Sequence, residues 1–300
     1  MLTGLHFILT YMCNSQCDHC FLYCSPHTRG TFTSDQVRQL LDEAVKIGTI
    51  KWIYFEGGEP FLFYPVMLEG IKMARTRGFQ VGIVTNAYFA TDDKDIEIWL
   101  RPLIELGIAN LSISNDPYHY EDEKNSPAVR ARQVALKMNL PATEIHVDRP
   151  VVTTDTEAGR DKGQPIIGGS TMFRGRAVDK LLAGLPLRSW ANLTTCPYED
   201  LESPKRVHLD NYGNVHLCQG LSMGNAWTVP LSGIVNKYNA SLHPVCGPLV
   251  RGGPALLAEE YRVQHEEKYV DACHFCYMIR IRLLDRFPLY LTPRQVYGLE

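Results

Sequence analysis

Cys13-Asn14-Ser15-Gln16-Cys17-Asp18-His19-Cys20 is the stretch around which this sequence of 300 residues is organised. It places three thiols at the spacing C-x3-C-x2-C, directly after the apolar run 5–11, which is typical of a first strand. Three thiolates in one tight loop can hold three irons of a cubane [4Fe-4S] cluster and leave the fourth iron without a protein ligand. The spacing therefore predicts an open iron at which a small molecule can bind and be reduced.

Two other interpretations of the triplet stay open on the residues alone. A structural zinc site would need Cys24 or His19 as its fourth ligand, although zinc prefers two CxxC-like or Cys/His pairs to a staggered triplet. Three core cysteines would be expected among apolar neighbours, but polar side chains flank these three. The triplet favours the open cluster.

The stretch CNSQCDHC resembles the signature of the radical S-adenosylmethionine (SAM) superfamily. The resemblance implies that SAM chelates the open iron through its amino and carboxylate groups. It also implies that an electron splits SAM into methionine and a 5′-deoxyadenosyl radical, which abstracts a substrate hydrogen. The family usually has an aromatic residue by the adenine before the last cysteine, and His19 takes that place here. Cys24 lies outside the signature, so we expect it not to be a ligand.

Composition excludes several classes of protein. The net charge is −3 with no basic block, so neither nucleic acid nor a membrane surface is an expected partner. No apolar run approaches the ~20 residues of a membrane helix, and no signal peptide is recognisable. The nine cysteines lie in two tight clusters plus singles, unlike a secreted disulfide framework. We expect a cytoplasmic protein.

Strand and helix patterns alternate over the first 185 residues and predict an α/β fold. About six such units favour an open, partial (β/α)6-type barrel, followed by a small C-terminal α+β module over residues 186–300. The polar stretch 153–169 is expected to be a surface loop. Ligands of such barrels bind at the C-terminal ends of the strands. The expected strands are 5–11, 52–55, 79–85, 111–114 and 144–147. The expected helices are one that is capped by residues 33–35 and ends before Gly48, and those over 64–77, 95–106, 127–138 and 176–182.

Gly57-Gly58-Glu59-Pro60 follows the second expected strand and could be only a turn. Together with the cysteine triplet it resembles the GGEP motif of the radical SAM superfamily. The resemblance implies that its backbone and the glutamate bind the amino group of SAM. A carboxylate beside exposed backbone also suits an ammonium group on physical grounds.

Weaker candidates lie at other strand ends. The family places polar groups for the ribose and carboxylate of SAM at positions that correspond here to Thr85, Asn86, Ser112, Ser114 and Asn115. Polar residues that commonly end strands would explain these five nearly as well. Past the fourth strand, Asp116 or His119 could touch substrate or move a proton, or could form a capped turn. Arg174 and Arg176 could bind a carboxylate or phosphate, or be solvated arginines at a helix start.

A second set of thiols lies in the C-terminal module: Cys196, Cys218, Cys273 and Cys276. A hairpin around residues 211–214 would return Cys218 toward Cys196, and the CxxC pair at a helix start would close a four-thiol site. Zinc and a [4Fe-4S] cluster fit such a site equally well.

The order Cys196…Gly213-x4-Cys218…Cys273-x2-Cys276 resembles the twitch module, the short relative of SPASM extensions, in its deoxy-scyllo-inosamine dehydrogenase type. The resemblance implies one fully ligated auxiliary [4Fe-4S] cluster. The gap from Cys196 to Gly213 is slightly longer than usual, and no cysteine cluster follows Cys276, which argues against a second auxiliary cluster. Cys246 is expected to be a buried loop cysteine.

A fully ligated cluster has no open iron, so its plain use is electron transfer. The sequence therefore favours an oxidoreductase that oxidises a substrate radical and is supplied by a one-electron donor such as flavodoxin or ferredoxin. The alternative is a maturase that cross-links or epimerises a ribosomal peptide, so the substrate is a small molecule or a peptide. A non-enzymatic electron carrier would not need the GGEP motif.

Overall fold

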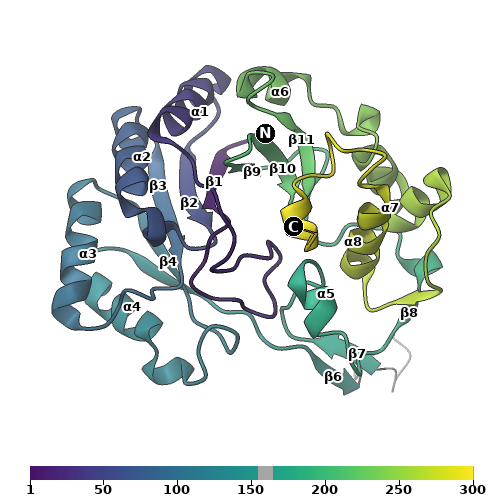
Figure 1. Ribbon diagram of the computed structural model, residues 1–300, viewed down its shortest axis with the longest axis horizontal. Helices are drawn as coiled ribbons and strands as arrows, with labels where there is room; N and C mark the ends of the chain where they lie inside the picture. Colours follow the sequence, from purple (N-terminus) through teal and green to yellow (C-terminus); the bar gives the residue numbers. More distant parts are fainter. Residues whose placement is uncertain (155–164, 300) are drawn as a thin grey trace.

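The computed structural model describes residues 1–154 and 165–299, and its centre is one eight-stranded sheet (Figure 1). The strand order is β11-β10-β9-β1-β2-β3-β4-β5. Strands β1 to β5 are parallel, β9 runs parallel to β1, and β10 and β11 are antiparallel. This confirms the α/β fold with a parallel, barrel-like core. The strands are β1 (Gly4–Thr10), β2 (Trp52–Gly57), β3 (Gln80–Thr85), β4 (Asn110–Ser114), β5 (Ala142–Ile145), β9 (Arg206–Asp210), β10 (Asn214–Cys218) and β11 (Leu221–Asn225).

Four helices cover the outer face of the parallel strands (Figure 1). They are α1 (Ser34–Ile47), α2 (Tyr64–Thr76), α3 (Asp93–Glu105) and α4 (Pro127–Lys137). Alternation along β2 explains the layering: Phe55 packs against Gly70 of α2, whereas Glu56 faces the inside of the barrel and lines a cavity there. The four helices expected from the sequence are confirmed, with α1 starting in a capping box between Thr33 and Gln36.

Three expectations about the strands need correction. The sixth strand parallel to the barrel strands is β9, which comes from the C-terminal part of the chain and pairs with β1 from Gly4↔Arg206 to Ile8↔Asp210. The predicted hairpin around residues 211–214 is confirmed, but it extends the barrel sheet. The stretch 153–169 is not all loop, because β6 (Val151–Thr154) pairs with β7 (Pro165–Gly168); residues 155–164 lie outside the described residues.

The C-terminal part packs a group of helices beside the hairpin (Figure 1). Helix α8 begins after Asp271, whose side chain accepts a hydrogen bond from the backbone N–H of His274, so the CxxC pair lies in its first turns as predicted. No helix among the described residues combines the length and apolar character needed to cross a membrane. The remaining elements are α5 (Arg176–Lys180), β8 (Arg188–Ser189), α6 (Leu231–Lys237), α7 (Cys246–Tyr261), β12 (Lys268–Tyr269), α8 (Ala272–Leu283) and the short 3-10 turns Pro60–Phe63, Glu123–Asn125, Trp190–Asn192, Ala240–Leu242 and Arg294–Tyr297.

Candidate active site

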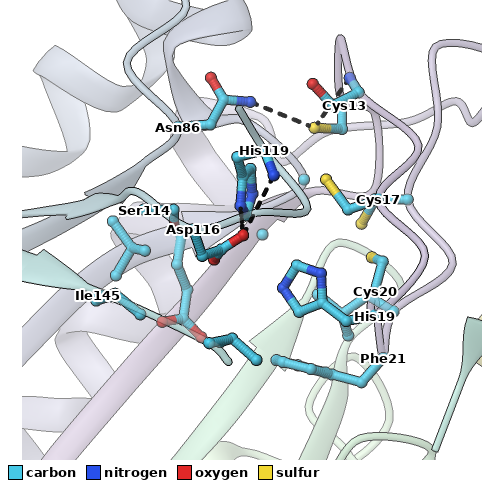
Figure 2. A pocket seen from close by; sticks show the side chains of 18 of the residues that line it. Cys13, Cys17, His19, Cys20, Phe21, Asn86, Ser114, Asp116, His119 and Ile145 are labelled. Carbon is cyan, nitrogen blue, oxygen red and sulfur yellow. Dashed lines mark hydrogen bonds and ion pairs between the residues drawn. The ribbon is translucent and has the colours of Figure 1, made fainter. Parts of the chain in front are cut away.

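A cavity of about 290 Å³ lies at the C-terminal ends of the parallel strands. Figure 2 shows the thiols of the first cysteine triplet along one wall, with Asn86, Asp116 and His119 across from them. The structure thus gathers groups from the loop after β1 and from the ends of β2, β3 and β4. The sequence-predicted residues that line the cavity are Cys13, Cys17, His19, Cys20, Gly57, Gly58, Thr85, Asn86, Ser114, Asp116 and His119.

Polar groups of the protein are directed at the thiol of Cys13. The backbone N–H of Ser15 donates to its sulfur at 3.4 Å, and the Asn86 amide lies 3.7 Å from it. Burial raises the pKa of Cys13 to about 12, whereas a hydrogen bond from the Cys24 thiol lowers the pKa of Cys20 to about 6. Donors directed at sulfur stabilise a thiolate cluster, so this donor set fits a [4Fe-4S] cluster held by three cysteines.

Arg176 fixes the cluster loop through its backbone. Its guanidinium donates to the carbonyl oxygens of Cys17 and Cys24 at 2.9 and 2.8 Å. The backbone N–H of Arg176 donates to the carbonyl oxygen of Cys20 at 3.0 Å. The donors that could have bound a substrate carboxylate are thus engaged with the loop. The expected substrate-binding role of Arg176 is therefore replaced by a role in shaping the loop.

The two glycines of GGEP are required by close backbone approach. Gly58 N–H donates to the carbonyl of Thr10 at 2.8 Å, and Glu59 N–H donates to that of Met12 at 2.9 Å. A Cβ atom at Gly58 would lie 2.1 Å from the Met12 carbonyl oxygen, and one at Gly57 would lie 2.4 Å from that of Thr10. These contacts join the end of β2 to the start of the cluster loop, while Pro60 begins a 3-10 turn.

The Glu59 carboxylate is buried beneath this backbone and does not reach the cavity wall. It accepts hydrogen bonds from Phe61 N–H at 3.0 Å, Thr85 Oγ1 at 2.9 Å and Asn86 N–H at 2.8 Å. Burial raises the pKa of Glu59 to about 7, against the lowering effect of these donors. Glu59 therefore orients the ends of β2 and β3 toward the cavity.

The remaining strand-end candidates divide into two groups. Asn86 lies in the wall and donates to Asn14 Oδ1 at 2.8 Å, and Ser114 lines the cavity as well. Ser112 instead contacts Thr143, and Asn115 accepts from Ser126, so neither lines the cavity. For these two, the structure favours the ordinary strand-end explanation.

The buried Asp116 and the partly buried His119 form a pair in the cavity wall. His119 Nδ1 lies 2.8 Å from Asp116 Oδ1, whereas Oδ2 has no hydrogen-bond partner among the described residues. Burial alone would lower the pKa of His119, but its contacts with Asp116 and Cys17 raise it to about 10. His19 stacks on Tyr118 at 4.4 Å between ring centroids, and burial lowers its pKa to about 4. A neutral planar ring at this position suits an adenine.

The floor of the cavity contains polar residues that were not predicted from the sequence. Glu56 lines it and is held by His6 at 3.1 Å and His208 at 3.2 Å. Their contacts lower the pKa of Glu56, against the effect of burial, which would raise it. These residues come from β2, β1 and β9, so the signal for them was limited to inward-facing polar positions in otherwise apolar strands.

A second site of thiols lies in the C-terminal part. Cys218 ends β10, while Cys273 and Cys276 lie in the first turns of α8. Burial, together with the nearby Cys218 and Cys196 thiols, raises the pKa of Cys276 to about 12, against the lowering effect of Arg280. The site thus draws together the four cysteines that the sequence singled out.

Two buried arginines distinguish this second site. Arg174, only 4% exposed, donates to the sulfur of Cys218 at 2.9 Å, and Arg280, 1% exposed, donates to the Gln219 carbonyl at 3.0 Å. The expectation that Arg174 binds substrate is therefore replaced by a contact with a thiol. Buried cations need anionic partners, and a tetrathiolate metal centre is anionic, so the donor set fits a metal centre.

Cys246 lies at the first position of α7 and not in a loop. It is buried as expected, and burial together with the Cys218 and Cys276 thiols raises its pKa to about 12. Five cysteines therefore surround the second site, of which the sequence resemblance selects four.

Comparison with known proteins finds a family match that covers the first site. Residues 7–132 match the family described as Radical SAM superfamily, a segment that includes the cysteine triplet and Gly57–Pro60. Over 284 residues the chain is 24% identical to "Putative peptide biosynthesis protein YydG" of Bacillus subtilis (strain 168), covering 93% of this chain and 80% of that protein. Over 113 residues it is 34% identical to the tungsten-containing aldehyde ferredoxin oxidoreductase cofactor-modifying protein of Pyrococcus furiosus, covering 37% of this chain and 30% of that protein.

Two solved structures are similar in chain path. Native anSMEcpe with bound AdoMet matches over 100% of this chain and 99% of its own, with a TM-score of 0.49 and 12% identity. BtrN in complex with AdoMet and 2-DOIA matches over 78% of this chain and 82% of its own, with a TM-score of 0.46 and 16% identity.

Proposed function

Because residues 7–132 match the Radical SAM superfamily, we propose that this chain is a radical SAM enzyme that oxidises a peptide substrate. The observation that carries the proposal is the cavity, whose walls combine the thiols of Cys13, Cys17 and Cys20 with the backbone of Gly57 and Gly58. When bound there, a [4Fe-4S] cluster and SAM supply a 5′-deoxyadenosyl radical that removes a hydrogen atom from substrate.

The protein's own residues prepare the cavity for this chemistry. Ser15 and Asn86 stabilise the thiolate of Cys13, and Arg176 holds the loop that carries all three ligands. The Gly57–Gly58 backbone lies at the wall where the amino group of SAM is expected, and His19 offers its ring to the adenine. Asp116 Oδ2, which has no partner among the described residues, is an acceptor for substrate or ribose.

The peptide assignment rests on the relative YydG, whose name refers to peptide biosynthesis and whose match spans 93% of this chain. We assign Cys196, Cys218, Cys273 and Cys276 to an auxiliary [4Fe-4S] cluster. In the proposed reaction an external donor such as flavodoxin or ferredoxin delivers one electron for SAM cleavage. After one hydrogen atom has left the substrate, a cluster held by these four cysteines would supply an acceptor for the one electron that the substrate must still lose, and the accompanying proton would pass to solvent.

The experiment uses synthetic peptides encoded by short reading frames next to the gene. Each peptide is incubated anaerobically with the reconstituted protein, SAM and a reductant in D₂O, and is then analysed by mass spectrometry. We expect 5′-deoxyadenosine and a peptide that has lost two hydrogen atoms. Incorporation of one deuterium without a net loss of hydrogen would replace oxidation by epimerisation. Unmodified peptides combined with active SAM cleavage would contradict the peptide assignment.

A further inference from the structure

We propose that Arg174 raises the reduction potential of the auxiliary cluster by donating a charge-assisted hydrogen bond to its ligand Cys218. The inference deepens the proposed function, on whose auxiliary cluster it rests. In this proposal, the buried Arg174 makes the second site a better electron acceptor.

The contacts of Arg174 place it between the two cysteine sites. Its Nη1 lies 2.9 Å from the sulfur of Cys218, on the auxiliary side. On the other side, its guanidinium carbon lies 5.1 Å from the ring centroid of Phe21, which follows Cys20 and lines the cavity. Arg174 therefore bridges the cavity wall and an auxiliary ligand.

The backbone after Arg174 makes this position rigid. A Cβ atom at Gly175 would lie 2.5 Å from the Cα of Phe21, so the chain passes directly over the cluster loop. Gly175 has a φ of +61°, a conformation that residues with side chains rarely adopt. Arg176 then donates to the carbonyl oxygens of Cys17 and Cys24. The guanidinium of Arg174 is thus anchored relative to both sites.

The charge of Arg174 is poorly neutralised by carboxylates. Arg174 forms an ion pair with Glu199 at 3.7 Å, and Glu199 also lies 3.7 Å from Arg206. Burial would lower the pKa of Arg174, but Cys218, Cys273 and Glu199 raise it, so the group stays cationic. The thiols are therefore the nearest groups that can balance a buried positive charge.

Reduction adds one negative charge to a cluster, and a cation bonded to a ligand sulfur stabilises the reduced form more than the oxidised form. Such a bond raises the potential and makes the cluster a better acceptor. Arg280 provides a contrast within the same site, because it donates to the Gln219 carbonyl and not to a sulfur.

The test is an anaerobic redox titration of the reconstituted full chain, followed by electron paramagnetic resonance of the auxiliary cluster. In Arg174→Gln we expect the reduced-to-oxidised ratio at a fixed potential to fall about tenfold, which is about 59 mV for one electron. Arg174→Lys keeps the charge but not the planar donor geometry, so its shift should be smaller. Arg206→Lys is the matched control, because it faces the same Glu199 with 52% of its side chain exposed, and should leave the potential unchanged.

Each outcome bears on one proposal. A wild-type chain without a second cluster would contradict the auxiliary-cluster assignment of the proposed function. A second cluster whose potential is the same in wild type and Arg174→Gln would overturn the inference alone. Loss of the auxiliary cluster in both the Gln and Lys variants would also overturn it, because Arg174 would then be needed for assembly.

Discussion

The two cysteine sites of this chain differ in where their thiols come from along the chain and in which groups contact them. The first takes its thiols from eight consecutive residues, and all three thiols line a cavity. The second takes its thiols from elements as far apart as Cys196 and Cys276; Cys218 and Cys273 are buried, whereas Cys196 is exposed. Neutral amides of Ser15 and Asn86 approach the first site, whereas a buried guanidinium, that of Arg174, contacts the second.

This difference indicates a division of labour. A cluster with three ligands beside a cavity can take a small molecule at its open iron. A cluster with four ligands beside buried cations has no free position, and its surroundings favour an added electron. In the proposed function, the first site would start the radical chemistry and the second would receive the electron.

The largest effect is expected when the first site is removed. Replacing Cys13, Cys17 and Cys20 together by Ala should abolish SAM cleavage, because no open iron remains. Iron should fall from about eight to about four atoms per chain, if each site holds one [4Fe-4S] cluster as proposed. The measurements are iron and sulfide analysis and chromatography of 5′-deoxyadenosine. Zinc in place of iron in this variant would show that the second site is a zinc site.

Breaking the second site should separate SAM cleavage from product formation. Cys276→Ala should still cleave SAM, because all ligands of the first site lie within residues 13–20, but it should lose product because the substrate radical has no electron acceptor. Cys246→Ala is the matched control, a buried cysteine at the same site that the proposed ligand set omits. Circular dichroism must first show that both variants are folded. Full product from folded Cys276→Ala would mean that the second site is structural.

The sequence predicts a site well when the residues of that site lie close together along the chain. The cysteine triplet and Gly57–Pro60 each lie within one short stretch of sequence. Their positions directly after two expected strands were therefore enough to place each motif at the end of a strand. The parallel sheet followed from the alternation of strands and helices. Helix α8 was predictable because Asp271 and the CxxC pair form a local start signal.

Non-local features could not be read in this way. Pairing of β9 with β1 joins residues about two hundred positions apart, and no local pattern specifies the partner of a strand. Glu56 meets His6 and His208 only after that pairing. The direction of the Arg174 side chain depends on its burial against Phe21, so an arginine that looked available for a substrate lies on a thiol instead.

A steric change should show that only the first site depends on strand contacts at GGEP. In Gly58→Ala the new Cβ would lie 2.1 Å from the Met12 carbonyl oxygen, so the start of the cluster loop must move. We expect a loss of about 2–4 kcal/mol in stability, and loss of the first cluster before the second on warming. Gly4→Ala is the control, since its nearest neighbour would lie at an ordinary 3.5 Å. Thermal melting followed by absorbance of the clusters measures both; equal loss of the two clusters would contradict the expectation.

The smallest effect concerns the charge of Glu59. If this carboxylate assists the ammonium of SAM through the Gly57–Gly58 backbone, Glu59→Gln should weaken SAM binding at pH 8 by about fivefold, or about 1 kcal/mol. Because the pKa of Glu59 is about 7, wild type is mostly protonated at pH 6, and the difference between the two proteins should shrink there.

The sign of this pH dependence follows from burial. The folded pKa of about 7 lies above the ordinary value of 4.5, so the contribution of Glu59 to stability is complete below pH 4.5 and is lost as the pH rises through 7. As the pH rises through 7, wild type should therefore gain affinity for SAM while the contribution of Glu59 to the free energy of unfolding is lost. Glu59→Gln should show neither change. The amino group of SAM titrates in the same way with both proteins, so the ratio of their dissociation constants isolates Glu59. Glu43→Gln, at a buried glutamate bonded to Ser232 on the outside of the barrel, is the matched control. A ratio that stays constant from pH 6 to pH 8 would leave SAM recognition at this strand end to the glycine backbone alone, and the auxiliary cluster should be unaffected in every variant of this series.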